Sequence, residues 1–136
     1  MTRQSADDPR KLRDVLARTQ LLATQHDVPS VVVGFAASEG SLLFPDFLVF
    51  LESELRVEDQ IFRLTRERAL LFLRDVDRQQ ATTVVERLRA SFEQEFPSID
   101  PMRVEIRYFE VPPGRAELSV KTVLPVVLRG QPASDD

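Results

Sequence analysis

Two charged residues, Arg56 and Asp59, form an Arg-x-x-Asp motif near the middle of the chain. Arginine can donate two parallel hydrogen bonds to an anionic group, and aspartate can accept hydrogen bonds from a donor. The two residue types together can therefore take part in recognising a ligand. The structural alternative is that the two side chains cap a helix end and pair with each other or with Glu52, as exposed charges commonly do.

Four arginines in and around the following segment are candidates for a local positive patch on an otherwise acidic protein: Arg63, Arg66, Arg68 and Arg74. Such a patch suits an anionic ligand or an acidic surface on a partner. Glu67 and Asp75 are interleaved with these arginines. The alternative is therefore a set of solvated strand edges on which opposite charges offset one another.

The segment from Phe44 to Leu51 has more apolar surface than one buried helix face can use. A surplus apolar face often binds a partner or a second copy of the same chain, which makes Phe47 and Phe50 candidate contact residues. The alternative is a helix sandwiched between the sheet and the first helix, with both of its faces covered.

Composition excludes several classes of function. The formal net charge is -4, and counterion release on a phosphate backbone rewards a dense excess of Lys and Arg, so a long nucleic acid is a poor partner. There is no cysteine, no Gly-x-x-x-x-Gly-Lys loop and no Ser/His/Asp set. The single histidine, His26, falls at a predicted helix end. We expect no catalytic residue, no metal site and no cofactor.

Export and membrane signals are not visible in the sequence. Met1 to Asp8 contains no apolar core of an export signal, and no apolar run approaches the roughly 20 residues that span a bilayer. We expect a cytoplasmic protein without a membrane segment.

The residues described above must be positioned by helices and strands that the apolar spacing predicts. Asp8, as N-cap before Pro9, begins a helix that runs to about Gln25. Residues 81–92 have the spacing of a long amphipathic helix that ends at Pro97.

The intervening and following segments predict the remaining elements. These are a doubly covered strand at 30–37, a helix that opens at Pro45, a hairpin of strands at 60–64 and 69–73, and a half-exposed strand at 103–111. The apolar residues of the stretch 117–128 alternate as in a strand, whereas Ser119 could cap a short helix, and Pro125 disfavours the interior of both. We expect a short helix or an irregular cover.

This order of elements predicts an α+β fold. We expect a ferredoxin-like core, in which a mixed β-sheet has helices packed on one or both faces, as a single layered domain. The domain is expected to span residues 8–129, with flexible termini at 1–7 and 130–136.

Residues 56–77 resemble the central segment of GGDEF domains, the bacterial diguanylate cyclase family. In that family an Arg-x-x-Asp pair precedes a strand that ends in arginine, the Gly-Gly-Asp-Glu-Phe hairpin turn, an apolar strand, an acidic loop and a long helix. The same features follow here without a gap: Arg56 and Asp59, Arg63, the turn at 65–68, the strand from Leu70 to Leu73, Asp75 and Asp77, and the helix from Ala81. The resemblance extends over residues 8–111 and implies a GGDEF-like fold. It also implies that Arg56 and Asp59 match the inhibitory site at which that family binds cyclic di-GMP.

The chain departs from the family where catalysis would take place. The signature reads Thr65-Arg66-Glu67-Arg68-Ala69, so residues with side chains replace both glycines, which let the backbone approach the phosphates. The first strand, from which the family takes a metal ligand, has no acidic residue between Asp27 and Glu39. Two-metal chemistry on GTP requires several carboxylates, and the departures therefore imply that the chain is not an enzyme.

We expect a catalytically inactive GGDEF-like signalling or scaffolding module from a bacterium that binds a protein partner or its own copy. A cyclic di-GMP receptor that uses Arg56 and Asp59 is the alternative. A third candidate is an RNA-binding module with Tyr108 and Phe109 as its aromatic pair, which the acidic charge disfavours.

Overall fold

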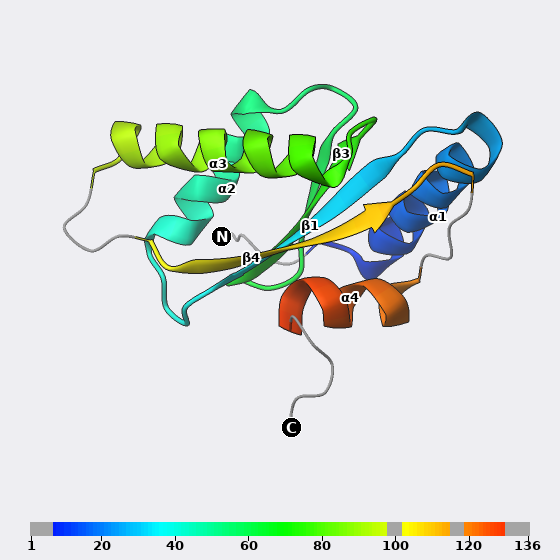
Figure 1. Ribbon diagram of the computed structural model, residues 1–136. Helices are drawn as coiled ribbons and strands as arrows, with labels where there is room; N and C mark the ends of the chain where they lie inside the picture. Colours follow the sequence, from blue (N-terminus) through cyan, green and yellow to red (C-terminus); the bar gives the residue numbers. More distant parts are fainter. Residues whose placement is uncertain (1–6, 98–101, 115–118, 130–136) are drawn as a thin grey trace.

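The computed structural model describes residues 7–97, 102–114 and 119–129. The helices and strands are shown in Figure 1: α1 (Pro9–His26), β1 (Ser30–Ala37), α2 (Leu43–Glu54), β2 (Gln60–Arg63), β3 (Arg68–Arg74), α3 (Arg78–Glu95), β4 (Val104–Val111) and α4 (Val120–Arg129). Every helix and strand that the sequence predicts is present. Of the termini expected to be flexible, 1–7 and 130–136, all residues but Asp7 lie outside the described residues.

The strands form one sheet in the order β2-β3-β1-β4, and every neighbouring pair is antiparallel. α2 connects β1 to β2 and α3 connects β3 to β4. Each of these helices returns the chain to a strand that is separated from its starting strand by one other. The ferredoxin-like arrangement is therefore confirmed. The expected mixture of strand directions is wrong, because the strand inserted within each crossover runs the opposite way.

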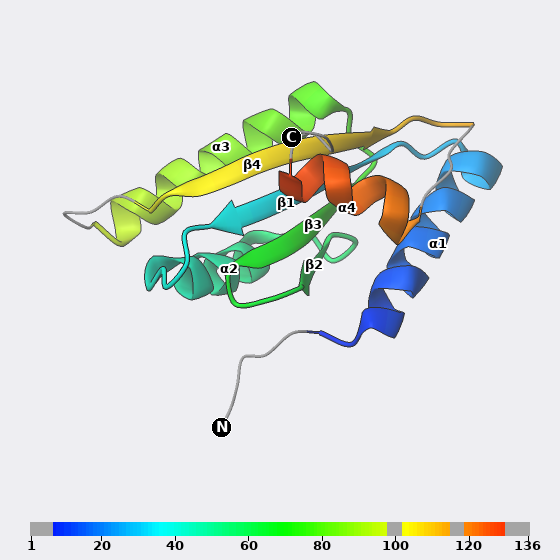
Figure 2. The same cartoon turned by 90° about the horizontal axis from the view of Figure 1, so that it is seen from below.

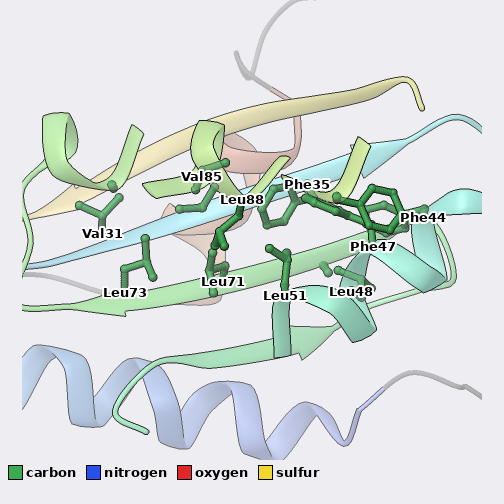
Figure 3. Close-up of a cluster of buried hydrophobic side chains, with 14 of the residues drawn as sticks. Val31, Phe35, Phe44, Phe47, Leu48, Leu51, Leu71, Leu73, Val85 and Leu88 are labelled. Atoms are coloured by element: carbon green, nitrogen blue, oxygen red, sulfur yellow. The ribbon is translucent and has the colours of Figure 1, made fainter. Parts of the chain in front are cut away.

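Two hydrophobic cores lie on opposite faces of the sheet. On one face, α2 and α3 pack against alternate residues of β1 and β3, among them Val31 and Leu71 (Figure 3). The other face is covered by α1 and α4 (Figure 2). These helices pack against the residues in between, such as Val32 and Leu70. β1 and β3 are therefore buried on both faces, as the continuous apolar run of β1 had indicated for that strand.

α2 lies against the sheet and beside α3, whereas α1 covers the opposite face. The expected position of α2 between the sheet and α1 is therefore wrong. The apolar residues of α2 are nevertheless mostly used within the chain, because they fill the core that this helix shares with α3: Phe44, Phe47, Leu48 and Leu51 are buried.

The helices α1 and α3 both begin at an aspartate that caps the first turn, as the sequence predicted for Asp8. Asp8 accepts a hydrogen bond of 2.9 Å from the backbone N–H of Arg10 at the start of α1, and His26 lies in the last turn of that helix. At the start of α3, Asp77 accepts from the backbone N–H of Gln80, whose side chain accepts from the N–H of Asp77 in return.

The stretch 117–128, for which the sequence left the conformation open, forms the helix α4 from residue 120 onward. Val123 and Val127 are buried one turn apart, and Pro125 lies within the helix. The helix approaches β1 closely at Gly34, where a Cβ would clash with the backbone carbonyl of Val127. Glycine is therefore required at this position by contact with α4. None of the described helices is both long and apolar enough to cross a membrane.

Candidate functional site

Arg56 and Asp59 lie in the turn between α2 and β2. The backbone N–H of Asp59 donates to the carbonyl of Arg56 at 3.0 Å and closes the turn. The Arg56 guanidinium donates from Nε to Asp59 Oδ2 and from Nη2 to Asp59 Oδ1, both at 2.9 Å. The two parallel hydrogen bonds that Arg56 was expected to donate to a ligand are thus donated to Asp59 of the same motif.

The end of β3 completes this site. The backbone N–H of Arg74 donates to Asp59 Oδ1 at 3.1 Å, and Arg56 Nη2 donates to the carbonyl of Arg74 at 2.6 Å. The backbone N–H of Arg56 donates to Asp59 Oδ2, so each carboxylate oxygen accepts two hydrogen bonds. The side chain of Asp59 is 3% exposed. In this arrangement the motif fastens the turn after α2 to the end of β3.

Arg56 nevertheless keeps one side open to solvent. Its side chain is 47% exposed and borders a cavity of about 320 Å³ that Leu55 and Ile61 also line. The hydrogen bond to Asp59 raises the pKa of Arg56, so the guanidinium stays charged. It can attract an anion, whereas Asp59 has no unused acceptor with which to read a guanine edge.

The turn at 65–68, which stands where the family signature would be, lies beside the end of β1. Ala36 is the cross-strand partner of Arg68. The carboxylate of Glu67 accepts from the backbone N–H of Gly40 at 3.4 Å and lies 4.0 Å from Arg66 Nε. The one carboxylate that the turn retains is therefore engaged by groups of the same chain.

The end of β1 that lies beside the turn at 65–68 contains apolar residues. Phe35 is fully buried, and Ala36 and Ala37 are half-buried, with the N–H of Ala37 donating to the Glu67 carbonyl at 2.8 Å. Among the described residues, no three or more His, Cys, Asp or Glu side chains are grouped so that they could hold a metal ion. The arrangement offers a single carboxylate where a two-metal reaction uses several.

The four arginines proposed as a patch do not form an uninterrupted positive surface. Arg63 donates two hydrogen bonds to Glu52, at 3.0 and 3.1 Å, and this contact raises the pKa of Arg63. Arg66 lies beside Glu67, Arg68 is exposed on the hairpin, and the backbone of Arg74 belongs to the site at Asp59.

Phe47 is fully buried, so its proposed role as a contact residue for a partner is wrong. Its ring packs edge-on against Phe35 and Phe92, at centroid distances of 5.7 and 5.2 Å. Phe50 is half-buried against Phe92 at 5.6 Å. The exposed apolar residue on this part of α2 is Val49, whose exposure is 61%. The helical spacing was predicted correctly, but it could not show which face meets α3.

The aromatic pair suggested for RNA binding is split between the two faces of the sheet. Tyr108 packs on the side of α2 and α3, with the guanidinium of Arg78 5.5 Å from its ring centre, whereas Phe109 packs on the side of α1 and α4. The two rings therefore cannot form one stacking surface, and the structure gives no support to the RNA-binding candidate.

A second hollow, of about 420 Å³, lies between α1 and β2 and was not predicted from the sequence. Lys11 and Arg18 line it from α1, and Arg63 and Glu52 line it from the opposite side. In the sequence, the hollow is indicated only by the regular spacing of charged residues along α1. Such a spacing is equally typical of a helix face exposed to solvent.

The N-terminal end of α1 closes part of the β2 edge. The backbone N–H of Asp7 donates to the carbonyl of Arg63, and Asp7 Oδ2 accepts from the N–H of Arg63, both at 2.8 Å. Asp7, which we expected within the flexible terminus, is therefore tied to the sheet.

The sequence matches no protein-family model and no characterised protein, but the fold is similar to that of solved structures. PelD from Pseudomonas aeruginosa PAO1 has a TM-score of 0.68 and 23% identity, over 93% of this chain and 47% of PelD. The FimX GGDEF domain from Pseudomonas aeruginosa has a TM-score of 0.69 and 13% identity, over 93% and 91%. The diguanylate cyclase SiaD from the same organism, solved in complex with its activator SiaC, has a TM-score of 0.65 and 20% identity, over 82% and 49%.

The chain therefore has a GGDEF-like α+β fold, and the fold implied by the sequence resemblance is confirmed. It spans about half the length of the PelD and SiaD structures and nearly all of the FimX GGDEF domain. Identities at this level show the fold, while the site residues must be judged from their own geometry.

Proposed function

We propose that this chain is a catalytically inactive GGDEF-like signalling or scaffolding module that acts by binding a protein. The observation that supports inactivity most directly is the turn at 65–68, where the carboxylate of Glu67 is engaged by Gly40 and Arg66 and the neighbouring end of β1 carries no acidic residue. A two-metal reaction on GTP needs several carboxylates around the triphosphate, and the residues described at this turn offer one.

A role in binding a protein is supported by the state of the charged residues and by the surface of the domain. The described residues form a complete two-core fold, and the charged side chains of the candidate sites, Arg56 with Asp59 and Arg63 with Glu52, are paired within the same chain. Such a domain acts through its surfaces. SiaD, which has this fold, was solved in complex with an activator protein. We further propose a bacterial, cytoplasmic setting, since the similar structures named above come from a bacterium.

Inactivity is tested by incubating the purified chain with GTP and Mg²⁺ or Mn²⁺ and separating the products by chromatography. We expect no dinucleotide under conditions in which an active diguanylate cyclase consumes the GTP. Glu67→Gln is the matched variant, because it removes the remaining carboxylate at nearly constant size. A dinucleotide that the parent makes and this variant does not would refute the proposed inactivity.

A cyclic di-GMP receptor is the second candidate, favoured by the exposed guanidinium of Arg56 beside a cavity of about 320 Å³. The saturated oxygens of Asp59 weigh against it, because a guanine could reach them only by displacing Arg56 or the backbone of Arg74. Calorimetry with cyclic di-GMP on the parent, on Arg56→Ala and on the control Arg66→Ala separates the candidates. The leading proposal predicts no heat of binding, and binding lost only in Arg56→Ala would establish the receptor.

A further inference from the structure

The two edges of the sheet differ in length and in cover. β2 is a short edge of four residues, and Asp7 already occupies both backbone groups of Arg63. β4 is an edge strand of eight residues at the other side of the sheet (Figure 2). A long unpaired edge is a template for a further strand, so β4 is the edge at which another chain can add to this sheet.

The hydrogen bonds of β1 show which groups of β4 face outward. The N–H of Ser38 donates to the carbonyl of Arg103 at the end of the β1–β4 ladder. Odd-numbered residues of β4 therefore bond to β1, and alternation directs the N–H and C=O groups of Val104, Ile106 and Tyr108 away from the sheet. Within the described parts of the chain, no backbone group bonds to them.

The side chains along this edge complement those of a second, antiparallel copy. Glu105 and Arg107 lie on the same face of β4, one on each side of Ile106. A two-fold axis through Ile106 places Glu105 of each copy directly opposite Arg107 of the other. These positions are non-hydrogen-bonded pairs, in which opposing side chains approach most closely. An axis through Glu105 or Arg107 would instead place like charges face to face.

Within a single copy, Glu105 and Arg107 make only a long contact with each other, so both side chains can pair with a second copy instead. Arg107 Nη2 lies 3.4 Å from Glu105 Oε1 of its own strand, and the Glu105 side chain is 69% exposed. Arg107 Nε is buried without a hydrogen-bond partner among the described residues. On the other face, the same axis sets Val104 opposite Tyr108, and both of these side chains are only half-buried in a single copy.

We infer that β4 is a self-association edge, at which two copies of this chain pair antiparallel about Ile106 and join their sheets into one. The Glu105–Arg107 contacts between copies select this register. The inference rests on the proposed function, since it names a partner for the interaction role.

The oligomeric state of charge-reversed variants tests this pairing. We expect the parent to sediment at twice its 15.5 kDa. Arg107→Glu and Glu105→Arg should each dissociate at concentrations about tenfold or more above those at which the parent does, because each sets like charges opposite one another at both contacts. An equimolar mixture of the two variants should pair again, as should the double variant, since both restore opposite charges. Lys121→Glu, on the exposed side of α4, is the control and should behave like the parent.

A monomeric parent, or a pair that the two reversals leave intact, overturns the inference, and circular dichroism of each variant verifies that it is folded. The cyclase assay distinguishes this failure from failure of the proposed function. A monomer without cyclase activity refutes only the pairing, whereas a dimer that converts GTP refutes only the inactivity.

Discussion

Asp59 stabilises the fold from within a motif that is associated with ligand binding. Its two oxygens accept hydrogen bonds from Arg56 and from the backbone of Arg74, so it joins the turn after α2 to the end of β3. The pairing of Arg56 with Asp59 was one alternative predicted from the sequence, beside ligand binding and a pairing with Glu52. The sequence could not predict the contact with Arg74, because that contact uses backbone groups that come together only when β2 and β3 pair.

Removing the Asp59 carboxylate should therefore destabilise the chain. Asp59→Ala leaves the N–H of Arg74 without its partner, and we expect the free energy of unfolding to fall by about 2 kcal/mol in urea denaturation. The control is Glu58→Ala, which removes a neighbouring carboxylate that is 39% exposed and should change stability by less than about 0.5 kcal/mol. Equal effects of the two variants would show that Asp59 is an ordinary surface charge.

Tyr108 offers a direct measure of burial at β4, since it is the only tyrosine in the chain. Burial is the main cause that raises the pKa of Tyr108 above its ordinary value of 10.0. Its absorbance titration should therefore have a midpoint above that value in the native chain and return to about 10 in denaturant. Folding favours the protonated phenol, so this contribution to stability is complete below the unfolded pKa and is lost as the pH rises through the folded pKa. A native midpoint at or below the denatured one would contradict the burial of this ring.

At the scale of the elements, the sequence predicted what is local. The cap at Asp8 predicted the start of α1 and the stop at Pro97 predicted the end of α3, because these signals act within a few residues of the helix end. The face on which α2 packs was not predictable. Its apolar residues fit several orientations, and the topology of the sheet decides that Phe47 is buried and Val49 is exposed.

α4 depends on a single glycine for its close approach to β1. Gly34→Ala should push the helix outward, because the new Cβ would clash with backbone atoms of Val127 that cannot change rotamer. We expect a loss of about 3 kcal/mol in the free energy of unfolding and faster hydrogen exchange of the α4 amides.

Gly40→Ala is the control for this prediction. That glycine has a positive φ of 78°, but no atom lies within 4 Å of the position that a Cβ would take there. Its substitution should therefore cost about 1 kcal/mol, from backbone strain alone, and leave exchange in α4 unchanged. An equal loss in both variants, without faster exchange in α4, would mean that the helix does not press on Gly34.

At the scale of the whole molecule, one sheet serves two cores, and its two central strands belong to both. The order of the elements predicted this architecture because ferredoxin-like crossovers leave few alternatives. The strand directions were mispredicted because β1 pairs with β3 and β4, from which it is separated along the chain by other elements. The sequence predicted Arg56 and Asp59 as the residues of the candidate site. That they join the turn after α2 to the end of β3 is seen only from their contacts.

The two hydrogen bonds between Asp7 and the backbone of Arg63 in β2 limit the number of copies that can join in one assembly. A chain with two free edges could add copies without end and grow into a fibre, as flat sheets do. Here Asp7 occupies the outward-facing backbone groups of Arg63 and shortens the open part of the β2 edge, so joining at β4 uses the longer edge and we expect assembly to stop at two copies.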